Sequence, residues 1–315
     1  MKLWDMSDMY ALINNYPNQF ERGFRLAESV QLPKDIKEIV ISAVSYNSAV
    51  AEIIQNVFKD ELTIPLIIHK ESGLPHKVSS QTLLIAISLC GHRAEVVSAA
   101  KAAYETGAKI IIITTGGELE DFARERKLPL ILAPKELPEW KFHMGQGIIL
   151  AILVQLLINA KVLTPLARQC VLGAASAIEK LYLTKLGQKL ADLMVGNNTL
   201  IYSSSLYSGL SRLIKTLANT LLLAPCFSNS FTELKYSEIY GLGHKGLGKY
   251  LVLILQDKNE NPDIQKNITD LQTKLTNNKT KHYLLDLPGQ NQLEKNLAAV
   301  MLFYWVIYAF LVEPK

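Results

Sequence analysis

The sequence is poor in the features that mark several classes of protein. Its three cysteines, Cys90, Cys170 and Cys226, are far apart and form no CxxC or metal-binding pattern, so we expect reduced thiols, no metal and a cytoplasmic protein. No G-x-G-x-x-G motif follows a predicted strand, which argues against a dinucleotide, and no other cofactor is expected. The net charge of +4 is small and no basic run concentrates it, so nucleic acid is not expected as a partner.

The sequence also lacks an apolar run long enough to cross a membrane. Residues 145–160 and 297–312 are uncharged, but both fall short of the roughly 20 residues that a spanning helix needs. Near the N-terminus, Asp5 and Asp8 stand where a signal peptide would have an apolar run. We therefore expect no membrane partner, and we interpret the two uncharged segments as buried helices at a domain interface or in the seam of a homodimer.

What the sequence does contain is a series of short apolar runs that predict a parallel sheet. Residues 83–87, 109–114 and 130–133 are largely apolar and are bounded by polar residues or glycine, as in strands that are buried on both faces. Between the first two runs, residues 94–106 are rich in alanine and end before a glycine, which predicts a helix. After the second run, two glycines at 116–117 open another predicted helix.

The same alternation continues through both halves of the chain. Further strands are predicted at residues 36–42, 66–71, 249–255 and 282–286 and from residue 198, with helices at residues 49–58, 263–277 and 290–312. This order predicts an α/β fold with two domains, each a parallel sheet flanked by helices. We place the first domain, with an N-terminal helical arm, at residues 1–155, and the linker helices with the second domain at residues 156–315.

The turn after the strand at residues 83–87 is the first candidate for a binding site. It reads S-L-C-G-H-R-A-E over residues 88–95 and leads directly into a helix. In parallel sheets, ligands bind at the carboxyl ends of the strands, where the N–H groups at a helix start attract anions. Small residues and a hydroxyl suit a phosphate there, and a plain connecting turn in which Ser88 caps the helix fits the same residues.

Residues 82–135 resemble the first sugar-isomerase (SIS) domain of the bifunctional phosphoglucose/phosphomannose isomerases. In that family the turn reads S-Y-S-G-N-T-x-E and the next strand ends I-T-x-G-G, which residues 88–95 and 113–117 follow in order and spacing. The resemblance extends less closely over nearly the whole chain. It implies two SIS domains, a phosphosugar as small-molecule ligand, a homodimer and aldose–ketose isomerase chemistry.

The resemblance assigns six positions to ligand binding: Ser45, Asn47, Ser88, Cys90, Arg93 and Lys141. Ser88 matches the family, whereas Cys90 and Arg93 replace hydroxyl residues of the phosphate turn and Lys141 replaces an arginine. Around Ser45 the family has a glycine-rich G-M-G-G-S-G turn. This chain has no glycine there and places Tyr46 in the turn, where a side chain disfavours left-handed geometry.

The catalytic positions of the family are also substituted. Isomerisation needs a carboxylate base and a group that opens the sugar ring, which the resembled family supplies as the Glu of an N-E-N-A-K helix and the His of an H-N motif. Here Thr220 stands at the base position and Tyr236 at the histidine position, and residues 218–225 contain no carboxylate. A threonine hydroxyl is not a base near neutral pH and tyrosine is a weak acid, so no catalytic residue is assigned firmly.

Three interpretations remain open from the sequence. The leading one is a divergent family member that binds a phosphosugar and whose isomerase activity is weak or lost. The second is a working isomerase in which Glu238 and His244 replace the catalytic groups while Arg93 and Lys141 hold the substrate. The third is a non-catalytic scaffold whose cleft is plugged by Tyr46 and Arg93.

Overall fold

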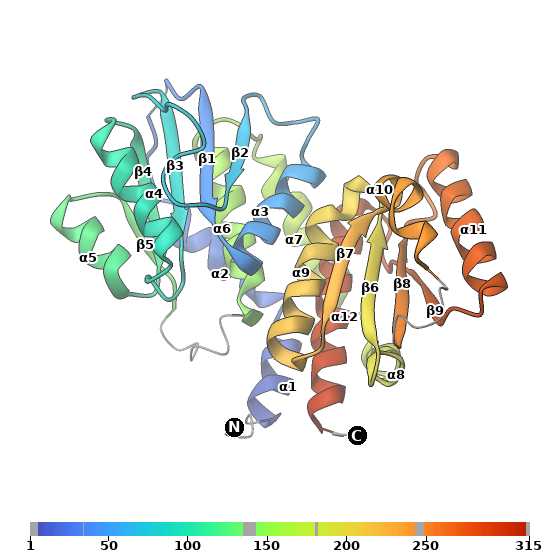
Figure 1. The fold of residues 1–315 in the computed structure, drawn as a ribbon. Helices are drawn as coiled ribbons and strands as arrows, with labels where there is room; N and C mark the ends of the chain where they lie inside the picture. The colour runs from blue at the N-terminus through green and yellow to red at the C-terminus, as the bar shows by residue number, and fades with distance from the viewer. Residues whose placement is uncertain (1–5, 34, 135–142, 180–181, 243–248, 313–315) are drawn as a thin grey trace. The chain divides into compact units, whose positions relative to one another are not determined.

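The computed structural model of the chain describes residues 6–33, 35–134, 143–179, 182–242 and 249–312. The chain forms two compact units, Asn15–Ser176 and Met1–Asn14 with Ala177–Lys315, which we call the first and the second unit. Each contains one parallel sheet with helices on both faces, which confirms the predicted α/β fold (Figure 1). The division differs from the boundary predicted between residues 155 and 156, because that position lies inside helix α6, Gln146–Asn159.

The sheet of the first unit has five parallel strands in the order β2-β1-β3-β4-β5. The strands are β1 (Glu38–Ala43), β2 (Leu66–His69), β3 (Thr82–Ile87), β4 (Lys109–Thr114) and β5 (Leu130–Leu132). The other helices of this unit are α2 (Asn18–Ala27), α3 (Ser45–Val57), α4 (Ala94–Glu105) and α5 (Gly117–Glu125), and α7 (Leu166–Glu179) leads toward the second unit.

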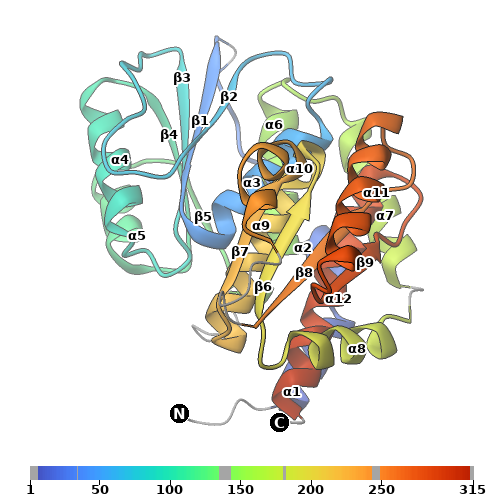
Figure 2. The ribbon, with the colours of Figure 1, turned by 45° about the vertical axis from the view of Figure 1, so that its right-hand side comes forward.

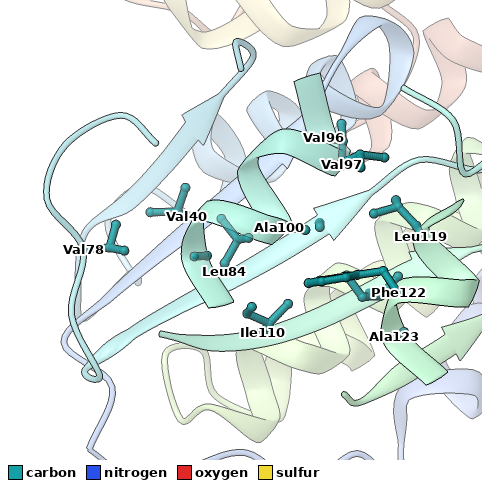
Figure 3. Close-up of a cluster of buried hydrophobic side chains, with 13 residues drawn as sticks. Val40, Val78, Leu84, Val96, Val97, Ala100, Ile110, Leu119, Phe122 and Ala123 are labelled. Atoms are coloured by element: carbon teal, nitrogen blue, oxygen red, sulfur yellow. The ribbon is translucent and has the colours of Figure 1, made fainter. Parts of the chain in front are cut away.

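Helices cover both faces of this sheet. Helices α4 and α5 lie on one side, and α3 and α6 lie on the other (Figures 1 and 2). Under α4 and α5, Leu84 and Ile110 of the strands pack with Val96 and Phe122 of the helices (Figure 3). Because successive side chains of a strand point to opposite faces, neighbouring residues such as Ile85 are buried on the other side. This two-sided burial explains the unbroken apolar runs of the sequence.

The second unit has a four-stranded parallel sheet in the order β7-β6-β8-β9. Its strands are β6 (Asn198–Ser203), β7 (Cys226–Ser230), β8 (Tyr250–Gln256) and β9 (His282–Asp286). Its α-helices are α1 (Met6–Asn14), α8 (Thr184–Met194), α9 (Ser208–Leu217), α10 (Phe231–Tyr236), α11 (Pro262–Asn277) and α12 (Gln292–Val312). Short helical turns are η2 (Ser205–Tyr207), the π-helical η3 (Ala218–Leu222) and η4 (Glu238–Tyr240).

Helix α12 is the one described helix that is long and apolar enough to cross a bilayer. It has 21 residues, so the expectation that the last apolar segment is too short is wrong. However, 78% of its most apolar 18-residue window is buried inside the structure. Tyr10 of α1 packs edge to face on Trp305 with ring centres 5.5 Å apart, which places α1 with the second unit. This burial is typical of a core helix.

A buried ion pair joins the end of β8 to α12 in the second unit. Lys295 Nζ donates a hydrogen bond to Asp257 Oδ1, and both side chains are almost fully buried. Asp257 Oδ2 accepts from the Tyr207 hydroxyl at 2.5 Å, and the amide of Asn259 donates to Asp257 Oδ1 at 2.8 Å. Burial alone would raise the pKa of Asp257, but the hydrogen bonds from Lys295 and Tyr207 outweigh burial and lower it. The carboxylate is therefore ionised and compensated.

Candidate functional site

The topology of the first sheet brings two strand-to-helix turns together. Strand β1 continues through α3 to β2 on one side of it, whereas β3 continues through α4 to β4 on the other side. The carboxyl ends of β1 and β3 are therefore neighbours where the chain connections diverge, and ligands bind at such switch points in open α/β sheets. The turns after these two strands carry the predicted ligand residues Ser45, Asn47, Ser88, Cys90 and Arg93.

The turn after β1 is tighter than predicted. Residues 45–48 form the first turn of α3, so the predicted helix start at residue 49 is wrong. Ser45 has a φ of 58°, in the left-handed region that residues with a Cβ rarely adopt. The Ser48 hydroxyl donates to the Ser45 carbonyl at 2.8 Å and holds this conformation. Serine thus keeps a backbone shape that suits glycine, with a strain of about 1 kcal/mol.

We expect the Ser45→Gly variant to be as stable as the wild type, or more stable by up to about 1 kcal/mol, because glycine relieves the left-handed strain while it adds entropy to the unfolded chain. Urea unfolding measures the difference. The matched control is Ser48→Gly in the same helical turn, which should lose about 1 kcal/mol because its backbone is helical and its hydroxyl bond is lost. Equal losses in both variants would contradict strain at Ser45.

The turn after β3 is fixed against the turn after β4 by backbone contacts. The amide and the hydroxyl of Thr115 both donate to the Leu89 carbonyl, at 3.0 and 2.7 Å. The Leu119 amide donates to the Gly91 carbonyl at 3.1 Å. Gly91 has a φ of +73°, and a Cβ at this position would lie 1.8 Å from the Gly116 carbonyl oxygen. Glycine is therefore required at the centre of this turn.

Two of the polar side chains in these turns, Ser88 and Asn47, are buried. Ser88 is buried, and its hydroxyl oxygen lies 3.5 Å from Cys90 Sγ, a weak hydrogen-bonding partner. Asn47 is 4% exposed, and its Oδ1 has no hydrogen-bond partner among the residues that the structure describes. Because an amide group can turn, Asn47 is able to donate to a phosphate oxygen or accept from a sugar hydroxyl.

The two helices that start at the switch point are suited to an anion. The N-cap residues are Val44 for α3 and Arg93 for α4, and neither makes a side-chain capping hydrogen bond. The N–H groups of a first helical turn have no partner within the helix, and together with the helix dipole they attract negative charge. The site therefore combines two helix N-termini that have no side-chain cap with the buried Ser88 and Asn47.

Tyr46 and Arg93 behave differently from each other. Tyr46 is 7% exposed, and its ring packs against His143 with centres 4.8 Å apart. Burial raises the pKa of Tyr46, the nearby Cys90 raises it further, and Arg93 lowers it slightly, so the hydroxyl stays protonated. The Arg93 side chain is exposed. An exposed Arg93 does not fill the site, so the interpretation in which both side chains plug it is wrong for Arg93, and of the two side chains only Tyr46 is buried.

Two further predicted site residues, Lys141 and His244, lie outside the described residues. His143, two residues after Lys141, is described, and its packing on Tyr46 gives it a structural role.

The residues at the family's catalytic positions belong to the second unit and engage in local contacts. Thr220 is exposed in η3, and its hydroxyl donates to the Thr216 carbonyl at 2.7 Å. Tyr236 at the end of α10 is 73% exposed, with the Lys235 ammonium 5.7 Å from its ring centre. Asn219, beside Thr220, exchanges two hydrogen bonds with the backbone of Cys226 and so fixes the start of β7.

Glu238, the predicted replacement base, is half-buried in η4. Its Oε1 accepts from Asn229 Nδ2 and its Oε2 accepts from the Ser237 hydroxyl, both at 2.7 Å. Burial alone would raise the pKa of Glu238, but these two hydrogen bonds outweigh burial and lower it. A carboxylate with a lowered pKa is a weaker base than an unperturbed one, which argues against this residue as a replacement.

Comparison with known proteins places both units in one family. Residues 34–164 match the SIS domain family, and residues 184–310 match the bacterial phospho-glucose isomerase C-terminal SIS domain. A bifunctional phosphoglucose/phosphomannose isomerase of Caldicellulosiruptor bescii is 32% identical over 132 residues, 41% of this chain and 39% of that protein's length. The chain belongs to the bifunctional phosphoglucose/phosphomannose isomerase family.

The likeness to this isomerase family extends over both SIS domains. The family member of Aquifex aeolicus is 22% identical over 314 residues, which are 98% of this chain and 93% of that protein. The fold is also that of tagatose-6-phosphate ketose/aldose isomerase of Escherichia coli, with a TM-score of 0.70 at 15% identity over 96% of that chain. The predicted family is thus confirmed, whereas the homodimer and the cytoplasmic location stay predictions.

In this family member, most of the ligand-binding residues predicted from the sequence lie at the switch point of the first unit. The fold brings Ser45, Asn47, Ser88 and Cys90 to adjacent turns, and their role in ligand binding stays a prediction. The turn after β4 and the packing of Gly91 against it, which hold the turn after β3, are not evident from the sequence. The paired glycines 116–117 were the available signal, and they were interpreted only as a helix start.

Proposed function

We propose that this member of the isomerase family binds a phosphosugar, such as glucose 6-phosphate or fructose 6-phosphate, at the switch point of the first unit, and that it isomerises the sugar slowly or not at all. The observation that supports binding most directly is that two helices without side-chain N-caps start at this switch point, beside the buried Asn47 Oδ1, which has no hydrogen-bond partner among the described residues. Backbone N–H groups supply many of the hydrogen bonds by which proteins bind phosphate. Phosphate binding therefore tolerates the exchange of individual hydroxyl side chains.

The loss of isomerisation is supported by the groups available for proton transfer. The family's base and ring-opening positions carry Thr220 and Tyr236, and both are exposed side chains. The nearby carboxylate, Glu238, has a lowered pKa and already accepts two side-chain hydrogen bonds. Acid and base catalysis contributes about 10²–10⁴-fold per group, so the absence of both groups removes most of the rate.

Calorimetric and thermal-unfolding titrations with the two sugar phosphates test binding. Because a ligand that binds only the native state stabilises it, we expect saturable stabilisation of about 2.7 kcal/mol at a hundredfold excess over Kd. In a coupled isomerase assay run beside the Aquifex aeolicus relative, we expect kcat/KM to be lower by about 10⁴-fold or more. The variant Ser88→Ala should bind more weakly, and the control Ser29→Ala, on an exposed residue of the same unit, should bind like the wild type.

The other interpretations predict different results. A plugged scaffold gives no response to either sugar phosphate or to inorganic phosphate, while Tyr46→Gly, which removes the ring from the site, restores binding. A working isomerase with replacement residues turns over at a rate comparable with the relative, and Glu238→Gln then abolishes the activity. Either pattern would overturn the proposal, since it requires binding without rapid turnover.

A further inference from the structure

A cavity of about 440 Å³ opens on the second unit, on the face of the sheet that also carries α10 and α11. Its floor consists of side chains on one face of three neighbouring strands: Leu200 and Tyr202 of β6, Phe227 and Asn229 of β7, and Tyr250 of β8. The volume lies within the range of small-molecule sites. The cavity reaches the amino end of β6 and belongs to the second sheet, so it is distinct from the switch point of the first unit.

One carboxylate borders this apolar cavity. Glu238 lies at the cavity wall, and its two oxygens each accept one hydrogen bond, from Asn229 and from Ser237. A carboxylate has about four acceptor positions, so each oxygen can accept one more hydrogen bond. The same two hydrogen bonds orient the group and keep it ionised.

Among the described residues that line the cavity, the charge of Glu238 has no counter-charge. Of the described residues that line it, none is a lysine, an arginine or a histidine. A partly buried charge without a counter-charge is unfavourable, and a cation that enters the cavity removes the imbalance. An anion, including a phosphosugar, is repelled by the negative charge of Glu238.

The remaining wall residues suit a cation that carries apolar groups. Tyr202, Phe227 and Tyr250 present aromatic rings, whose faces attract ammonium groups. Burial raises the pKa of Tyr202, and the nearby Glu238 and Tyr250 raise it further. Carboxylate and rings therefore border the same space.

We propose that this cavity binds a small organic cation, an alkylated or quaternary amine, whose ammonium group lies beside Glu238 and among the rings of Tyr202, Phe227 and Tyr250. The second unit thereby acquires a ligand site of its own, opposite in charge preference to the phosphosugar site. One site is proposed to bind an anion and the other a cation, so each can be tested without the other.

Choline chloride and its neutral isostere 3,3-dimethylbutan-1-ol test the proposal on the full chain by calorimetry and ligand-observed NMR. We expect saturable binding of choline, and binding of the isostere weaker by about tenfold or more, because the two differ in charge and hardly in shape. Sodium chloride at equal ionic strength is the control for screening. Equal affinity for choline and the isostere, or no saturation by choline, would overturn the proposal.

Two variants locate the binding. Glu238→Gln preserves the size of the side chain and should weaken choline by about tenfold or more while the isostere is unaffected, and Glu233→Gln, an exposed carboxylate on α10, is the matched control with unchanged binding. Phe227→Leu keeps an apolar side chain at a 57% exposed position and should weaken choline through the loss of the ring. Unchanged choline affinity in Glu238→Gln, with the thermal midpoint of the wild type, would refute the site.

Discussion

Replacing Lys295 with alanine is expected to destabilise the second unit by about 3–5 kcal/mol, the usual effect of removing one partner of a buried ion pair. The ammonium of Lys295 is the only positive group that donates to Asp257 among the described residues, and both side chains are almost fully buried. Without it, the carboxylate retains hydrogen bonds from Tyr207 and Asn259 but keeps its charge in an interior that disfavours it. Urea unfolding followed by circular dichroism measures the loss.

The same unit contains a matched control for this change. Lys258 and Asp286 form an ion pair of 2.6 Å, but their side chains are 69% and 53% exposed. Exposed pairs contribute about 0–1 kcal/mol, so Lys258→Ala should change stability little. If Lys295→Ala and Lys258→Ala lower the free energy of unfolding by similar amounts, this prediction is wrong. The carboxylate of Asp257 would then be solvated, and the buried pair would contribute no more to stability than an exposed one.

The pH dependence of stability should report on the same carboxylate. The pKa of Asp257 is lowered in the folded state, so its contribution to stability is fully present above the unfolded value of about 3.9 and is lost as the pH falls through the lowered value. The stability difference between the wild type and Lys295→Ala is therefore expected to be largest near neutral pH and to shrink on acidification, once Asp257 takes up a proton. A difference that grows on acidification contradicts this assignment.

The strands of the first unit were predictable because they are buried on both faces. The predicted run at residues 109–114 coincides with β4, and the run at residues 83–87 with all but one residue of β3. Strand β7, with the sequence C-F-S-N-S, was missed because it is an edge strand in which Cys226 alone is fully buried. Its first residue is held by the Asn219 side chain, seven residues earlier, and the strand pattern does not show that contact.

The site was predictable in part for a similar reason. A parallel sheet places strand-to-helix turns at one edge, so Ser88 and Cys90 follow from the strand pattern and the family resemblance together. The left-handed Ser45 did not follow, because four polar residues without glycine favoured a turn and the structure begins a helix there. Pairs such as Asp257 and Lys295, 38 residues apart, become partners only through the fold.

The second large effect is expected at the turn after β3. Gly91→Ala should destabilise the first unit by about 2–5 kcal/mol and abolish the stabilisation by phosphosugar, because it combines left-handed strain with a collision against backbone. A Cβ at Gly91 would lie 1.8 Å from the Gly116 carbonyl oxygen and 3.0 Å from Gly117 Cα. Neither neighbour is a flexible side chain, so relief requires the two turns to separate. The hydrogen bonds that Thr115 and Leu119 make across them are then lost.

Gly107 is the control that separates the steric clash of a Cβ from the strain of a left-handed backbone. It has the same φ of +73°, but no atom lies within 4 Å of the Cβ that alanine would add. Gly107→Ala should therefore lose only about 1–2 kcal/mol from the left-handed backbone and should keep phosphosugar binding. The difference between the two variants measures how firmly the turn after β4 holds the turn that is proposed to bind phosphate. Equal losses, with binding retained in both, would mean that the first turn reaches its binding shape without that support.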